Sequence, residues 1–228
     1  TVTIGDSGDT INIVGTLQNN GAAIPGDISS VVAGTGLSGG GTSGDVTLNV
    51  DLISKQAGTN FTNSLLVGTS STGTLSSADG NTGVGIEAFS SLTSGDNNTA
   101  VGFAALCDNT TGSENTAVGK TALVRNTTAS SNTAVGMNSL FTNTTGASNT
   151  AVGGCSLFAN TTGEDNTAIG KNALITNTTG DHNVAVGLEA LNKNTTADNN
   201  VAVGTCASGC NTTGHSNVAI GFSALCTN

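Results

Sequence analysis

The pattern of apolar and polar positions repeats every 17 residues from Asn81 to the end of the chain. The motif Asn-Thr-Ala-Val-Gly starts at Asn98, Asn115, Asn132, Asn149 and Asn166, and related versions start at Asn81, Asn183, Asn200 and Asn217. A fixed period of this size is typical of solenoids, in which similar coils stack along one axis. Positions in the unit are numbered 1 to 17 from this Asn.

Three apolar columns run through the units. Position 4 is Val or Ile in all nine, and position 2 is Thr in six and Val in the last three. Residues two apart share one face of a strand, and β-branched side chains suit that conformation. Position 9 is Leu or Phe in eight units, beside a small Ala or Ser at position 8. We therefore predict that these columns form a narrow core, with position 4 contributing Val101, Val118, Val135, Val152, Ile169, Val186 and Val203 and position 9 contributing residues such as Leu106.

The length of the unit and its glycines predict β-coils. Seventeen residues cannot hold two helices, whereas two strands of about five residues and two turns fit. Position 5 is always Gly, which predicts a corner with positive φ or close backbone approach. These corner residues include Gly102, Gly119, Gly136, Gly153, Gly170, Gly187 and Gly204. Position 15 is Gly in six of eight complete units and marks a second corner.

Asn fills position 1 in every unit and position 12 in eight units. In a stack of coils such side chains form ladders of amide hydrogen bonds along the axis, which satisfy buried polar groups and fix the register. We assign this structural role to Asn98, Asn109, Asn115, Asn132, Asn149, Asn166, Asn183 and Asn200. The competing interpretation is that Asn-Thr-Thr binds a ligand. Its seven copies, starting with Asn109, also match the N-glycosylation pattern.

The N-terminal region lacks the period. Residues 1–17 alternate apolar and polar residues around Gly-Asp turns, which predicts short strands. Residues 18–30, with the only Pro, fit a linker. The prediction is an all-β chain: a β-rich segment over 1–55, a transition with a degenerate first coil over 56–80, and a parallel β-roll, or β-solenoid, of 17-residue coils over 81–228.

The repeat, Asn-Thr-Ala-Val-Gly followed by an Ala-Leu pair, resembles the head repeats of trimeric autotransporter adhesins. That resemblance implies a left-handed parallel β-roll, three copies of which associate side by side. This chain departs from the family in its 17-residue period and its inserted Asn-Thr-Thr-Gly turn. Residues 31–50 (VVAGTGLSGGGTSGDVTLNV) are similar to a Gly-rich element of bacteriophage tail-fibre proteins.

Charge limits the partners. The chain has 15 acidic and only five basic residues, a formal net charge of −10, which argues against nucleic acid. The same charge disfavours an anionic membrane surface, and no apolar run reaches transmembrane length. The chain begins at Thr1 with neither Met nor a signal peptide, which indicates a fragment or a processed form.

Chemistry-bearing residues do not converge on an active site. The five cysteines fall at positions 10, 7, 7, 11 and 10 of their units and are not part of the repeat pattern, so the favoured interpretation is small buried or half-buried side chains. A bridge within the segment Cys206–Cys226 is the alternative, since it fits the spacing of adjacent coils. His182 and His215 lie in turns, and acidic residues such as Asp181 and Asp198 line one edge, where solvation is favoured over calcium binding. We expect no enzyme activity, no cofactor and no metal.

The expected function is therefore structural or adhesive. We expect a section of an extracellular or virion fibre, such as a tail fibre, that mediates attachment or forms a rigid shaft as a homotrimer. A cell-surface receptor or glycan is the expected target, and the variable positions 6, 7, 10, 11, 16 and 17 are expected to contact it. Alternatives are a self-assembling extracellular filament and, less favoured, an ice-binding protein or a polysaccharide depolymerase.

Overall fold

The computed structural model describes residues 31–32, 37–41, 48–50, 55–58, 60–68 and 72–226. The strands expected over 1–17 and the linker expected over 18–30 lie outside these residues. The chain divides into two compact units, Thr1–Leu52 and Ile53–Asn228.

The first unit contains a small antiparallel sheet. Its strands are β1 (Val31–Val32), β2 (Leu37–Gly41) and β3 (Leu48–Val50), in that spatial order. Val31 pairs with Gly41, and Leu37 pairs with Val50. The Gly-rich segment is therefore β structure in its described part.

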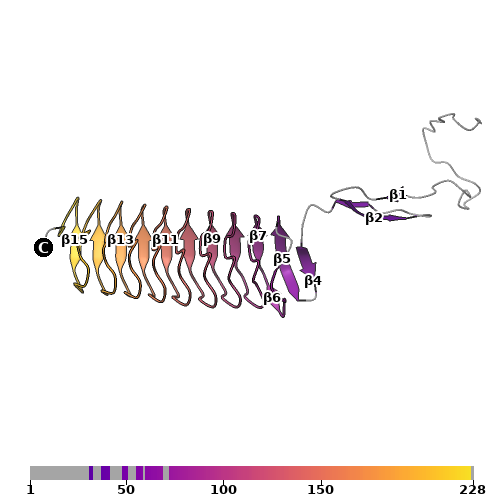
Figure 1. The fold of residues 1–228 in the computed structure, drawn as a ribbon, viewed down its shortest axis with the longest axis horizontal. Helices are drawn as coiled ribbons and strands as arrows, with labels where there is room; N and C mark the ends of the chain where they lie inside the picture. Colours follow the sequence, from indigo (N-terminus) through magenta and orange to yellow (C-terminus); the bar gives the residue numbers. More distant parts are fainter. Residues whose placement is uncertain are drawn as a thin grey trace, which may run out of the picture. The chain divides into compact units, whose positions relative to one another are not determined.

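The second unit is a stack of coils along one axis (Figure 1). It opens with β4 (Lys55–Gly58), antiparallel to β5 (Phe61–Val67), and β6 (Ala78–Asp79) pairs with β5 off the main path. From β5 onward the sheet is parallel and each coil adds one strand. These strands are β7 (Thr82–Val84), β8 (Thr99–Val101), β9 (Thr116–Val118), β10 (Thr133–Val135), β11 (Thr150–Val152), β12 (Thr167–Ile169), β13 (Val184–Val186), β14 (Val201–Val203) and β15 (Val218–Ile220).

Paired residues in neighbouring strands of the parallel sheet are one 17-residue unit apart. Thr133 pairs with Thr150 and Val135 with Val152, a shift of one unit, and the same holds between every pair from β7 to β15. The predicted all-β parallel solenoid of 17-residue coils is thus confirmed. Among the described residues, no helix is long and apolar enough to cross a membrane.

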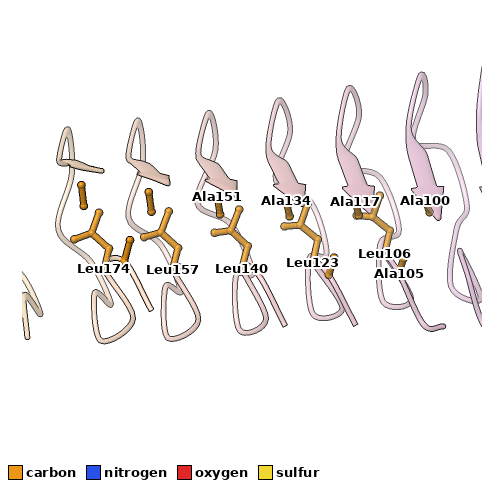
Figure 2. Packing of buried hydrophobic residues seen from close by; sticks show 14 of the residues in the cluster. Ala100, Ala105, Leu106, Ala117, Leu123, Ala134, Leu140, Ala151, Leu157 and Leu174 are labelled. Atoms are coloured by element: carbon orange, nitrogen blue, oxygen red, sulfur yellow. The ribbon is translucent and has the colours of Figure 1, made fainter. Parts of the chain in front are cut away.

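The core differs from the one predicted. Position 3, not positions 2 and 4, points inward: Ala117, Ala134 and Ala151 are fully buried and face the position-9 leucines (Figure 2). The prediction that the position-4 residues Val101, Val118, Val135, Val152, Ile169, Val186 and Val203 belong to the core is wrong. Their side chains project from the other face of the strand, because strand residues alternate faces and the buried Asn at position 1 places position 3 inside.

From β7 onward, each described coil has one strand rather than the two expected. Alternate residues on the second side have positive φ, for example Ala104 (52°) and Leu106 (49°), which is left-handed helical rather than extended backbone. Successive turns replace the expected second strand. Their backbone still bonds neighbouring coils: Leu106 N–H donates to Ala122 O (3.1 Å), and Ala104 N–H donates to Ile86 O (2.9 Å).

Candidate functional site: an exposed apolar sheet face

Two internal ladders set the orientation of every strand. At position 1, Asn115 Nδ2 donates to Asn98 Oδ1 (3.1 Å) and to Ala129 O (2.9 Å). At position 12, Asn126 Nδ2 donates to Asn109 Oδ1 (2.9 Å) and again to Ala129 O (2.9 Å). The ladder residues predicted from the sequence are all buried, with no more than 1% exposed: Asn98, Asn109, Asn115, Asn132, Asn149, Asn166, Asn183 and Asn200. The buried amides explain the invariance of these positions without a ligand.

The position-5 glycines form the corner after each strand. Gly119 has φ 140°, and a Cβ there would lie 2.5 Å from Gly136 O. The sequence predicted either a positive φ or a close approach of the backbone at this corner, and the structure shows both. The same φ region, 131–140°, is found at Gly102, Gly119, Gly136, Gly153, Gly170, Gly187 and Gly204.

The corner and the ladders turn positions 2 and 4 of β7–β15 outward, and we call this surface the strand face. Its position-4 side chains are 36–41% exposed at Val84, Val101, Val118, Val135, Val152, Ile169 and Val203. Position 2 supplies Thr from β7 to β12 and Val from β13 to β15. The strand face therefore carries only Thr, Val and Ile over nine coils, with no charged residue.

An exposed ridge at position 6 extends this apolar surface past the glycine corner. Ile86 (63% exposed), Phe103 (45%), Met137 (55%) and Leu188 (45%) belong to it. It is interrupted at Lys120, Gly154, Lys171 and Thr205. With coils about 4.8 Å apart, strand face and ridge together measure roughly 40 Å by 10 Å. Exposed apolar surface of that extent is typical of an interaction site.

The acidic edge at positions 16 and 17 has a structural use. Glu164 N–H donates to Asp181 Oδ1 (2.8 Å), and Asp181 N–H donates to Asp198 Oδ1 (2.9 Å). His215 Nδ1 accepts from Asp198 N–H (3.0 Å) in the same way. Each of these side chains caps a backbone N–H of the preceding coil, which is a hydrogen-bonding role that sequence reasoning missed. Within the described residues, no group of three His, Cys, Asp or Glu side chains could hold a metal ion.

A short aromatic stack lies on the turn side. The rings of Phe141 and Phe158 stack with centroids 5.1 Å apart, and the Arg125 guanidinium lies 5.7 Å from the Phe141 centroid. These residues occupy positions 10 and 11, and all three are at least partly exposed. Their contacts follow from the stacking of equivalent and adjacent positions in neighbouring coils, which places the rings and the guanidinium close to one another.

The repeated glycosylation pattern falls on the inner ladder. Six of its seven Asn residues are fully buried: Asn109, Asn126, Asn143, Asn160, Asn177 and Asn194. Each of these amides donates to the carbonyl three residues later, as Asn143 Nδ2 does to Gly146 O (2.9 Å). In the folded chain these nitrogens are inaccessible to a glycosyltransferase.

Comparison with protein-family models, with curated proteins and with solved structures gives no match. The structure and sequence of the chain itself therefore carry the functional argument.

Proposed function

We propose that this chain is a non-enzymatic section of an extracellular or virion fibre, working as a homotrimer of parallel solenoids that forms a shaft or mediates attachment. The observation that carries the proposal is the strand face, an exposed and uncharged surface of Val, Ile and Thr that is continuous over nine coils. The resemblance of the repeat to trimeric adhesin heads supports the same assembly.

Parallel association suits the regularity of the coils. Every copy presents the same residues at the same spacing along its axis, so a threefold axis parallel to the stack aligns equivalent coils at equal heights. The position-4 side chains of three copies then lose their remaining contact with water, which is favourable by about 25 cal/mol per Å² buried. A coil with so narrow a core gains stability from a second buried surface.

The variable outward positions remain for recognition. A shaft packed through its strand face leaves the turns at positions 10, 11, 16 and 17 on the outside, where a receptor or glycan would make contact. The net charge of −10 disfavours nucleic acid as that partner.

Native mass measurement tests the assembly. The wild-type chain, at 22.1 kDa, is expected to give about 66 kDa at micromolar concentration. Val135→Lys on the strand face places a charge in the interface and is expected to give monomers with unchanged circular dichroism. Thr145→Lys, at an exposed turn position of the same repeat unit, is the matched control and is expected to stay trimeric.

Two results contradict the proposal: a wild-type monomer at these concentrations, or a Val135→Lys variant that remains trimeric. Masses that grow without limit as concentration rises would instead favour the self-assembling filament.

A second candidate, ice binding, is favoured by the outward Thr column from β7 to β12. This column and the neighbouring Val column give a flat array with the coil spacing. Thermal hysteresis in a dilute, monomeric solution would support it, and its absence at millimolar concentration would dismiss it.

A further inference from the structure

Three of the five cysteines belong to the last two coils, and two of them touch. Cys210 Sγ and Cys226 Sγ are 3.4 Å apart and come from adjacent coils. Cys210 is exposed and Cys226 is partly buried. Two thiols in van der Waals contact need only a small side-chain adjustment to reach the bonding distance of about 2.05 Å.

The two cysteines occupy positions that four other coil pairs join through the backbone. Position 11 N–H donates to position 10 O of the next coil at Asp108 and Val124 (3.0 Å) and at Thr142 and Phe158 (3.1 Å). Within the described part of the chain, no such bond joins Cys210 to Cys226, and three other coil pairs lack it as well. A link between the two cysteine side chains would add a connection that the backbone does not make at these positions.

The interior of the same two coils is poorly filled. Ser208 stands at position 9, where the other eight coils have Leu or Phe. A hollow of about 230 Å³ is lined by Ser208, Asn211, Gly214, Asn217 and Leu225. The ladder contact from Asn211 Nδ2 to Asn194 Oδ1 lengthens here to 3.4 Å. Ser208 therefore leaves its coil without the large apolar core side chain that the other eight coils have at this position.

We propose that Cys210 and Cys226 form a reversible disulfide that staples the last two coils, with a small-molecule disulfide such as oxidised glutathione as oxidant. The Cys210 thiolate attacks a glutathione sulfur, and one glutathione thiolate leaves. The Cys226 thiolate then attacks Cys210 Sγ, the second glutathione leaves, and the two protein thiols lose two protons and two electrons. The oxidant is reduced to two glutathione thiols.

The order of attack follows from the surroundings of the thiols. Cys210 is exposed and Cys226 is partly buried, so Cys210 is the thiol that meets the oxidant first. The hydrogen bond with Cys210 raises the pKa of the Cys226 thiol, which suits its role as the second nucleophile. Cys206, the third cysteine of the cluster, makes no thiol hydrogen bond among the described residues. The direct sulfur contact is the one between Cys210 and Cys226, and the proposed pairing does not depend on the proposed trimer.

The disulfide is tested by counting free thiols with DTNB. The protein is first incubated in oxidised glutathione and then in reduced glutathione. Under denaturation, the wild-type count is expected to fall from five to three, and the Cys206→Ser count from four to two. Cys210→Ser and Cys226→Ser are expected to keep four thiols. Chymotryptic cleavage after Phe222 should leave the two cysteine peptides linked until dithiothreitol is added.

A protection assay adds a functional readout. Native cleavage after Phe222 should be several-fold slower in the oxidised wild type than in its reduced form, and equal in both conditions for Cys210→Ser. Persistent glutathione adducts, a bridge to Cys206, bridges only between chains, or no loss of thiols would each overturn the proposal.

Discussion

At the residue scale, Asn and Gly carry most of the architecture. The Asn side chains satisfy one another and the turn carbonyls inside the stack, so the interior tolerates two polar columns beside its Leu and Ala columns. The position-5 glycines let the backbone of one coil approach the carbonyl of the next at positive φ. Neither role involves a ligand.

Breaking one ladder should be costly. Asn143 Nδ2 donates to Asn126 Oδ1 (3.0 Å), and Asn143 Oδ1 accepts from Asn160 Nδ2 (2.8 Å). Asn143→Ala takes a hydrogen-bond partner from each of the buried amides of Asn126 and Asn160. We therefore expect the free energy of unfolding to fall by about 2–4 kcal/mol. Urea denaturation measures this loss. Thr145→Ala, at an exposed turn position, is the control with a change below about 0.5 kcal/mol.

Two adjacent glycines provide a sharp test of the corner. A Cβ at Gly153 (φ 134°) would lie 2.6 Å from the carbonyl of Gly170, whereas a Cβ at Gly154 meets nothing within 4 Å. Gly153→Ala should lose about 2 kcal/mol or more, from backbone strain and the clash. Gly154→Ala should be neutral or gain about 0.4–1 kcal/mol through the unfolded state. Equal melting temperatures for the two variants would contradict this assignment of the corner.

At the element scale, one coil is a three-residue strand followed by successive turns, and its only large core side chain is at position 9. The strand's inward residue is Ala, which leaves room for this Leu across a thin interior (Figure 2). The outward residues are larger and β-branched. The larger side chains of each strand therefore point away from the core of the coil, toward the partner that we propose covers the strand face.

Replacing one buried and one exposed leucine tests which of them belongs to the core. Leu140 is fully buried and Leu188 is 45% exposed on the ridge. Leu140→Ala should lose about 2–5 kcal/mol, because it removes the main core contact of its coil and leaves a cavity. Leu188→Ala should lose less than about 1 kcal/mol of the stability of the coils. Guanidinium denaturation compares the two, and a larger loss for Leu188→Ala would overturn the described core.

At the scale of the whole molecule, two opposing terms would govern the assembly of the proposed trimer. The strand face favours association through burial of apolar side chains. The charge of −10 per chain opposes it, since three aligned copies bring together about three times that charge.

Salt should therefore strengthen the proposed trimer. Screening lengths fall from about 30 Å at 0.01 M to about 3 Å at 1 M ionic strength, which removes most of the repulsion between exposed carboxylates. Sedimentation equilibrium at low and high salt should show tighter association at high salt. Weaker association at high salt would indicate that ion pairs, rather than apolar contacts, hold the chains together.

The sequence alone determined the coil. Its 17-residue period fixed the in-register parallel stack, the Asn columns predicted the ladders, and the invariant Gly predicted the corner. These features repeat because each coil meets an identical neighbour, so local pattern and tertiary contact coincide.

Only the tertiary structure decided which way each strand faces and what the second side does. Val and Ile at position 4 are apolar and suit either side of a strand, so their hydrophobicity favoured the core, while the buried Asn at position 1 turned them outward. The left-handed residues at positions 7 and 9 carry ordinary side chains such as Leu, which give no local signal of positive φ. Contacts between coils impose that conformation, as the hydrogen bonds of positions 7 and 9 to neighbouring coils show.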